Sequence, residues 1–162
     1  MHLMELFKIL VLSALANGTP LAAKKIFASR FSCPVDGGMT LADGRPLFGP
    51  SKTVRGVLAS ILVTTACAPL IGLPASIGAI AAAAAMAGDL FSSFVKRRLN
   101  FPPSSQAIGL DQVPESLFPM LACRHALSLT MIDVVLGVVI FFAGELILSV
   151  LLFRLDLRDR PY

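Results

Sequence analysis

The long apolar run near the middle of the chain ends in Gly88-Asp89-Leu90-Phe91-Ser92-Ser93-Phe94-Val95-Lys96-Arg97-Arg98. An acid therefore lies inside what otherwise has the composition of a membrane-spanning helix, and three consecutive cations mark where that helix leaves the lipid. A carboxylate at such a depth costs roughly 2.5–3.5 kcal/mol on insertion scales, so it normally faces a protein interior or a water-filled cavity. Asp89 and Lys96, seven residues apart, share one helix face, with Ser92 and Ser93 on the turns between them. This stretch predicts a transmembrane helix with a polar stripe about 10 Å long, suited to a phosphate and metal site at the interface.

Composition places the chain among membrane proteins. Of its 162 residues, 56% are hydrophobic and only 15% are charged, against about 25% charged in soluble domains. The mean hydropathy is +0.79. This length accommodates about four to six helices of about 20 residues, so we expect a single all-α membrane domain over residues 1–162. The three cysteines show no CxxC spacing, which argues against a zinc site or a disulfide framework.

Hydropathy predicts about five transmembrane helices. The expected spans are residues 3–23, 57–73, 75–95, 113–129 and 131–153, and the loops at 24–56 and 96–112 lie on one side of the membrane. A tight turn at Gly72-Leu73-Pro74 joins the second and third spans. The fourth span is the weakest because prolines and charged residues interrupt it, and a re-entrant segment is the alternative.

The lysines and arginines set the predicted orientation. Twelve of the fourteen lie in the first long loop, directly after the third span, or after the fifth span. If five helices alternate, all of these cations share one side, so the positive-inside rule predicts an outside N-terminus and a cytoplasmic C-terminus for a multi-pass protein of the cell membrane. A four-span arrangement would place the last basic cluster, Arg154, Arg158 and Arg160, on the wrong side. Because orientation accounts for the net charge of +4, no nucleic-acid partner is indicated.

The first cytoplasmic loop is rich in Gly and Pro and shows no amphipathic period, so we expect a structured loop. Its segment Gly49-Pro50-Ser51-Lys52-Thr53 resembles a P-loop, but two residues separate the glycine from the lysine and no strand precedes it. The remaining feature is a set of glycines whose N–H groups can approach an anion beside Lys52, Thr53 and Arg55. A basic loop that contacts anionic lipid headgroups is the alternative.

Asp111 opens the fourth span at the membrane surface, on the same side as Asp89. Two carboxylates that converge from neighbouring helices beside several cations are the arrangement expected for Mg²⁺ bound to a polyphosphate. The reason is that Mg²⁺ prefers one or two carboxylates together with phosphate oxygens and water. Asp111 is equally suited to act as a helix N-cap, and the two roles can coexist.

Three motifs occur in order along the chain. They are PxDxGxxxxDGRxxxGxxKTxRG in the first loop, GDLxxSFxKRR at the end of the third span and LDQ before the fourth. Together they resemble the CDP-archaeol synthase family, which is related to the CDP-diacylglycerol synthases and activates lipid phosphates with CTP. The resemblance runs from Asn17 to Tyr162 and implies a five-helix integral membrane enzyme. Such an enzyme condenses CTP with an ether-lipid phosphate of the membrane, releases pyrophosphate and requires Mg²⁺.

The resemblance also implies roles for individual residues. Asp89 and Asp111 are the implied metal ligands and, with Lys96, the implied catalytic groups of an active site on the cytoplasmic face. The residues implied to bind or surround the substrate are Asn17, Asp36, Asp43, Lys52, Thr53, Arg55, Ser92, Ser93, Arg97, Arg98 and Gln112. We expect no nucleophilic side chain, because a metal and several cations suffice to neutralise the repulsion between a lipid phosphate and CTP.

The last helix departs from the family pattern. Family members tend to carry His and Asn where this chain has Glu145 and Ser149, which affects the lipid substrate more than the CTP chemistry. An ester lipid, as for CDP-diacylglycerol synthases, is therefore the alternative substrate. Glu145 is expected roughly 15 Å deep in the bilayer. There it either pairs within the protein, for example with Arg124, or lines a tunnel for the lipid.

Two other classes of protein are compatible with intramembrane acids. A small transporter or channel would place Asp89 and Glu145 near a pathway, but it would not need a long basic Gly/Pro-rich loop on one side only. A non-catalytic membrane subunit would need small-residue helix packing but not converging carboxylates. The set of motifs favours the enzyme.

Overall fold

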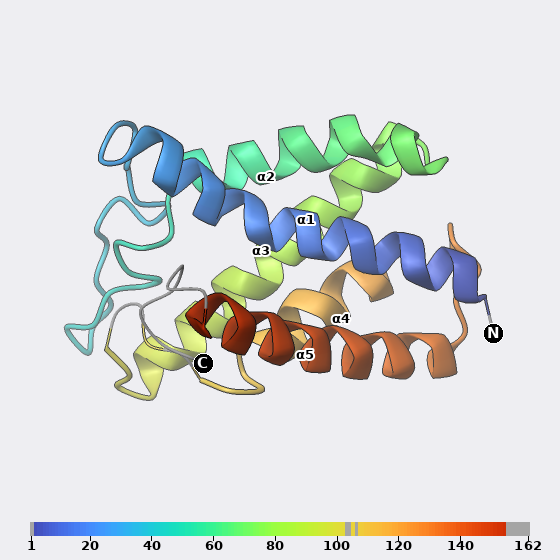
Figure 1. Cartoon of the computed structure of the whole chain (residues 1–162). Coiled ribbons are helices and arrows are strands. Elements are labelled where there is room, and N and C mark those ends of the chain that lie inside the picture. The colour runs from blue at the N-terminus through green and yellow to red at the C-terminus, as the bar shows by residue number, and fades with distance from the viewer. Residues whose placement is uncertain (1, 103–104, 106, 155–162) are drawn as a thin grey trace.

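The computed structural model describes residues 2–102, 105 and 107–154, and these form five α-helices and one short 3₁₀ helix (Figure 1). The helices are α1 (Leu3–Phe27), α2 (Val54–Cys67), η1 (Ala68–Ile71), α3 (Ala75–Arg98), α4 (Gln112–Cys123) and α5 (Met131–Arg154). The predicted all-α class is confirmed, and the number of α-helices is five as predicted. Arg158 and Arg160 of the predicted last basic cluster, and the side chain of Arg154, lie outside the described part of the chain.

Four stretches of the described chain are long and apolar enough to cross a membrane: Leu3–Phe27, Val54–Ile71, Ala75–Arg98 and Met131–Leu151. The predicted turn between the second and third spans is present, with Gly72 at a φ of 74°. The fourth helix differs from the expectation. α4 has 12 residues, which corresponds to about 18 Å against a hydrocarbon core of about 30 Å.

A continuous helix over residues 113–129 is therefore not formed. α4 ends at Cys123 and turns follow it, with Ser128 at a left-handed φ of 52°. Thr130 and Asp133 then start the next helix with a reciprocal cap. Thr130 N donates to Asp133 Oδ2 at 3.0 Å, and Asp133 N donates to Thr130 Oγ1 at 3.2 Å. Such a capping box satisfies free N–H groups at a helix start, so α5 begins at Met131 as a separate element.

Successive α-helices run in alternating directions (Figure 1). The N-terminal end of α1 lies at the end of the bundle where α3 and α5 begin. The long loop of residues 28–53 lies at the opposite end, where α1, α3 and α5 finish. α3 is central, since it packs against α1, α2 and α4, whereas α5 packs against α4 and α1. Both charged loops thus meet at one end of the bundle.

Small residues let the helices approach each other closely. Ala81, Ala82 and Ala85 of α3 are fully buried. Ser60 Oγ of α2 donates to the carbonyl oxygen of Ala16 in α1 at 2.8 Å. Close contact between small side chains is the main source of helix association in lipid. The alanine-rich helix α3 is thus central and tightly packed.

Most of the buried charged groups lie at the opposite end of the bundle from the larger apolar cluster. The larger core cluster includes Leu6, Ile9, Leu12 and Met120 and lies toward the start of α1. The buried polar groups at the loop end are Asp36, Ser92, Ser93, Lys96, Arg97, Gln112, Glu115 and Ser116. Burying charge is costly unless partners are supplied, so the loop end is the place to look for a functional site.

Candidate functional site

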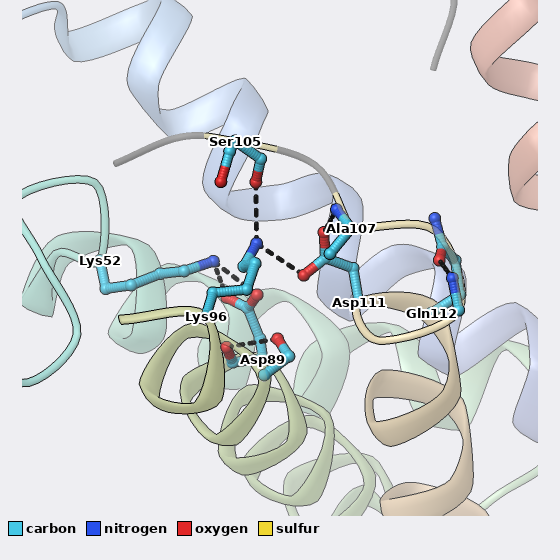
Figure 2. A network of polar contacts seen from close by, with 9 residues as sticks. Lys52, Asp89, Lys96, Ser105, Ala107, Asp111 and Gln112 are labelled. Atoms are coloured by element: carbon cyan, nitrogen blue, oxygen red, sulfur yellow. Dashed lines mark hydrogen bonds and ion pairs between the residues drawn. The ribbon is translucent and has the colours of Figure 1, made fainter. Parts of the chain in front are cut away.

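The charged groups at the loop end are organised around two largely buried lysine–carboxylate pairs (Figure 2). Lys52, at the end of the long loop, places Nζ 2.5 Å and 2.6 Å from the two carboxylate oxygens of Asp89 on α3. The loop is held to this position because Val35 N donates to Lys52 O at 2.8 Å. The acid that the sequence placed inside a membrane helix thus has a cation as its partner, as a buried carboxylate requires.

The second pair joins the end of α3 to the start of α4. Lys96 Nζ lies 2.6 Å from Asp111 Oδ1 and donates to the carbonyl oxygen of Ser105 at 2.9 Å. Asp111 Oδ2 accepts a hydrogen bond from Ala107 N at 2.9 Å. Asp111 is at the N-cap position of α4, as suggested, but its side chain makes no capping bond among the described residues. Its backbone already has helical dihedral angles of −79° and −54°, whereas a capping residue normally has an extended backbone.

Arg97 is a buried cation with open hydrogen-bond donors. Its side chain and backbone are only 4% exposed, and its Nε and Nη1 have no hydrogen-bond partner within the described residues. Gly49 of the long loop lies over it, since a Cβ added there would be 4.0 Å from Arg97 Cδ. A buried guanidinium with unused donors is costly, and its planar set of N–H groups matches a phosphate.

Asn17 on α1, like Arg97, has buried polar atoms without a hydrogen-bond partner among the described residues. These atoms are the oxygen and the nitrogen of its amide. Ser92 and Ser93 are buried as well, but Ser92 Oγ donates to the carbonyl oxygen of Asp89 at 2.9 Å. Asn17 therefore fits a polar ligand site, whereas the hydroxyl of Ser92 is bonded within its own helix.

Asp36 folds the long loop. Its Oδ1 accepts from Gly38 N at 3.0 Å, and its Oδ2 accepts from Phe48 N at 2.9 Å and Gly49 N at 3.0 Å. Burial alone would raise the pKa of Asp36, but the hydrogen bonds from Gly49, Phe48 and Gly38 outweigh it and hold that pKa below its ordinary value of 3.8. Through these bonds Asp36 fixes the position of Gly49 next to Arg97.

Arg98, an implied phosphate binder, is bonded to the long loop instead. Its Nη1 lies 2.6 Å from Asp43 Oδ2, and its Nη2 donates to the carbonyl oxygen of Pro46 at 2.6 Å. Arg45 donates in return to the carbonyl oxygen of Arg98 at 2.6 Å. The last carbonyls of a helix lack partners within the helix and attract cations. Asp43, Arg45 and Arg98 therefore fasten the loop to the end of α3.

Arg55, another implied phosphate binder, also has backbone partners elsewhere. Its guanidinium donates to the carbonyl oxygens of Ala28, at 3.1 Å, and Arg30, just after the end of α1. It also lies over the ring of Phe27, 6.0 Å from the centroid. Arg55 is on α2, and its guanidinium lies against the start of the long loop, where the chain leaves α1.

Thr53 and Gln112, both implied to bind substrate, have structural partners. Thr53 caps α2, because its hydroxyl accepts a hydrogen bond from Gly56 N at 3.2 Å. Gln112 Oε1 accepts from Gly109 N at 2.8 Å and so ties the second loop to the first residue of α4. Both side chains shape the backbone that surrounds the two lysine–carboxylate pairs.

Glu115 is a residue of this site that sequence reasoning missed. It is 9% exposed. Its carboxyl group lies near the carboxyl groups of Asp89 and Glu145 and near the ammonium group of Lys52. Asp111 directly precedes α4, and Glu115 lies about one helical turn, or about 6 Å, further along. Both carboxylates therefore come from the start of the same helix. The sequence offered only one sign of this role, an acid in the weakest apolar span.

Glu145 also belongs to this end of the bundle, through its interaction with Glu115. The suggested pairing of Glu145 with Arg124 was wrong. Arg124 Nε donates to the carbonyl oxygen of Leu129 at 3.3 Å, at the end of the bundle where α5 begins. Glu145 lies about 21 Å along α5 from Met131, which is too far for an arginine to reach.

The donors fit a metal ion that arrives with a substrate. No three His, Cys, Asp or Glu side chains gather closely enough to hold a metal ion in the described part of the chain. Proteins usually bind Mg²⁺ with one or two carboxylates plus substrate phosphates rather than with a complete protein cage. Asp89 and Asp111, each beside a lysine, supply that number of carboxylates.

The fold and the site define a multi-pass helical membrane protein with a largely buried site of paired cations and carboxylates at one end of its bundle. The family described as CarS-like, CDP-archaeol synthase, matches residues 6–162, and the chain belongs to this family. The CDP-archaeol synthase of Thermofilum pendens is 30% identical over 153 residues, which cover 91% of this chain and 75% of that protein.

Two further comparisons agree with this assignment. The CDP-archaeol synthase of Pyrococcus furiosus is 43% identical over 89 residues, which cover 49% of this chain and 53% of that protein. The chain thus spans about half the length of this relative. The solved structure of an intramembrane enzyme for archaeal membrane lipid biosynthesis is 31% identical. It superposes with a TM-score of 0.71 over 88% of this chain and 91% of that one.

Proposed function

We propose that the chain is a CTP:lipid-phosphate cytidylyltransferase that makes the CDP-activated ether lipid CDP-archaeol and pyrophosphate. The observation that carries the proposal is the buried guanidinium of Arg97, whose Nε and Nη1 have no partner within the described residues. It adjoins Lys96, which forms one of the two lysine–carboxylate pairs. Such a set of cations suits a polyanionic substrate, and membership of the CDP-archaeol synthase family supports CTP as that substrate.

The reaction brings two anions together. An oxygen of the lipid phosphate attacks the α-phosphorus of CTP, the bond from that phosphorus to the oxygen bridging to the β-phosphate breaks, and pyrophosphate leaves. Lys52, Lys96 and Arg97 offset the repulsion and stabilise the charge that develops on pyrophosphate. A phosphate monoester is already largely ionised at pH 7, so the site needs no side chain as a base. Catalysis is then a matter of position and charge.

Asp89 and Asp111 would hold the Mg²⁺ ion that the family implies. When bound, it would supply further positive charge beside the triphosphate. The chain's own contribution is to orient the two carboxylates, since Lys52 fixes one and Lys96 fixes the other. Asn17, with both amide atoms buried and unpartnered among the described residues, is a further group for the polar part of a substrate.

The orientation predicted from the cations supports a site on the cytoplasmic face of the cell membrane. We infer that the chain crosses the bilayer five times, with its N-terminus outside and its C-terminus in the cytoplasm. The alternating directions of α1 to α5 support this path (Figure 1). α4, too short to cross alone, completes its crossing with the turns of residues 124–130. The lipid phosphate reaches the site from the bilayer, between helices.

Incorporation of labelled CTP into extracted lipid tests this proposal. The purified protein, given CTP and an ether-lipid phosphate, should release pyrophosphate and label the lipid only when Mg²⁺ is present. An ester-lipid phosphate in a parallel reaction tests the alternative substrate. A transporter, a channel or a structural subunit would label neither lipid, and that result would overturn the proposal.

A further inference from the structure

Pro20 lies inside α1 and leaves one carbonyl group of that helix without its usual partner. Proline has no N–H, so the helix cannot form the hydrogen bond from position 20 to the carbonyl oxygen of Ala16. Ala16 is fully buried, and a buried carbonyl group without a donor is costly. This position therefore needs a donor from another part of the structure.

Ser60 of α2 supplies that donor. Its Oγ donates to the carbonyl oxygen of Ala16 at 2.8 Å, and Ser60 is itself fully buried. Gly56, about one turn earlier on α2, leaves room for the proline ring, since a Cβ added at Gly56 would lie 3.2 Å from Pro20 Cβ. One hydrogen bond and one close contact thus join α1 to α2 at this crossing.

The bonded carbonyl group directly precedes Asn17. The carbonyl of Ala16 and the backbone nitrogen of Asn17 belong to the same planar peptide group. By holding this group, Ser60 fixes the backbone from which the Asn17 side chain projects. Both polar atoms of that side chain are buried and have no hydrogen-bond partner within the described residues.

Asn17 lies at about the depth of the lysine–carboxylate site. Ala16 belongs to the same buried cluster as Met86 of α3, which is about one turn before Asp89. Asn17 and Asp89 precede the ends of α1 and α3 by about 15 Å and about 14 Å. Both helices finish at the same end of the bundle (Figure 1). The unpartnered amide is therefore level with Asp89.

The chemistry of an amide favours one part of the two substrates. An asparagine side chain carries an acceptor oxygen and two donor hydrogens. An ether-lipid phosphate offers mainly acceptors, whereas cytosine carries an amino donor beside ring acceptors, and the ribose hydroxyls both donate and accept. The nucleoside part of CTP is therefore the group that would satisfy the amide of Asn17 in full.

We propose that Ser60 is a positioning residue that, by bonding the carbonyl group left free by Pro20, holds Asn17 in place for the nucleoside part of CTP. This inference rests on the proposed function. The alternative is that Ser60 only stabilises the contact between α1 and α2. Ser13 provides a matched control, because it is also fully buried and its Oγ donates to a backbone carbonyl oxygen, that of Ile9 in its own helix, at 2.9 Å.

The first experiment compares Ser60→Ala with Ser13→Ala in the full chain. Binding of labelled CTP in the presence of Mg²⁺ and without lipid is measured by equilibrium dialysis, and kcat and the KM values for CTP and for the lipid phosphate are measured with both substrates. Ser60→Ala should weaken CTP binding and raise the KM for CTP about tenfold, because a small displacement of a binding group has a large effect. Its kcat and its KM for the lipid should stay near the wild-type values.

Ser13→Ala should bind CTP as the wild-type protein does. CTP binding by Ser60→Ala at the wild-type level would overturn the inference, and so would an equal loss in Ser13→Ala. A rise in the KM for the lipid instead of the KM for CTP would also overturn it, because Asn17 would then serve the other substrate.

Two double-mutant cycles test the two steps of the argument. Pro20→Ala restores an N–H to the helix, so Ser60→Ala should have little effect on CTP binding in that background. Asn17→Ala should weaken CTP binding about tenfold or more, and Ser60→Ala should add nothing to this loss. Additive losses in either cycle would contradict the inference, because Ser60 would then act independently of Pro20 or of Asn17.

The same measurements separate this inference from the proposed function. If the wild-type protein binds CTP but labels no lipid, the proposed function fails. If the wild-type protein is active and Ser60→Ala loses thermal stability without a change in CTP binding, only the role of Ser60 is contradicted. If Ser60→Ala does not fold, Ser60→Cys takes its place, since a thiol is a weak donor of similar size, and it should show a smaller loss of CTP binding.

Discussion

Lys52 and Asp89 stand 37 residues apart in the chain, and the lysine ammonium lies 2.5 Å and 2.6 Å from the two oxygens of the aspartate. The pair connects the last part of the long loop to the middle helix of the bundle. It also explains how an acid is kept inside a membrane helix, because an unpaired carboxylate there would be costly. Each member of the pair is expected to matter differently for activity and for stability.

Asp89→Asn should lower turnover by a factor of 10–100 or more, because a neutral amide is a poor metal ligand. The change is nearly isosteric, so the protein should still insert and purify normally. Labelled CTP incorporation at several Mg²⁺ concentrations measures the effect. Near-normal activity at low Mg²⁺ would remove Asp89 from the site.

Arg97→Gln should raise the KM for CTP about tenfold or more, because a hydrogen bond to a charged group contributes about 1.5–3 kcal/mol. Since Arg97 has open donors and no acidic hydrogen-bond partner in the described residues, its loss should not reduce thermal stability. Lys25→Gln removes an exposed charge in the last turn of α1 and serves as the control. Equal KM values for the two variants would argue against phosphate binding by Arg97.

Gly88→Ala should impair both stability and activity, because its methyl group would meet the carbonyl oxygen of Pro114 at 2.3 Å. Forcing extra volume into a packed interface typically costs about 1–3 kcal/mol. Gly144→Ala on α5 is the matched control, since a Cβ there meets no atom within 4 Å among the described residues. Thermal unfolding in detergent should separate the two variants, and an unchanged Gly88→Ala would show that α4 does not rest closely on α3.

Asp36 should make the long loop sensitive to acid. Its pKa is held below the ordinary value of 3.8, so its stabilising hydrogen bonds are fully present above that value and are lost as the pH falls through the lowered pKa. Protection of the Phe48 and Gly49 amides should therefore stay constant from neutral to mildly acidic pH and fall only in stronger acid.

Asp36→Asn should remove this protection at all pH values, because an amide NH₂ would replace one of the two acceptor oxygens. Hydrogen exchange followed by mass spectrometry measures both effects. If the variant keeps the protection of the wild-type loop, Asp36 does not organise it.

The orientation predicts opposite accessibility for Ser51 in the long loop and Ser76 at the start of α3, both of which are exposed. Single cysteines at these positions, in a chain whose Cys33, Cys67 and Cys123 have been replaced, should react with an impermeant thiol reagent only from opposite sides. Ser51 should be labelled from the cytoplasm and Ser76 from outside. Labelling of both from one side would contradict five crossings.

The sequence by itself determined the helical class, the long apolar segments and the end of the bundle that carries the charges. These features are local, because apolar length and the position of charges along the chain fix which segments enter lipid. The fourth segment shows the limit of this reasoning. Hydropathy placed the start of α5 correctly, but it could not foresee that α4 ends at Cys123 and has only 12 residues.

Only the tertiary structure decided which charged groups form the site. Arg97 and Arg98 are neighbours in the sequence, yet Arg98 is bonded to Asp43 whereas Arg97 keeps open donors among the described residues. The start of α4 lies against α3 beside Asp89 only because Gly88 has no side chain. The local sequence determines on which face of its helix a side chain lies. Its interaction partner depends on which segment, distant in the sequence, packs against that face. That choice is made by the contact surfaces of whole helices.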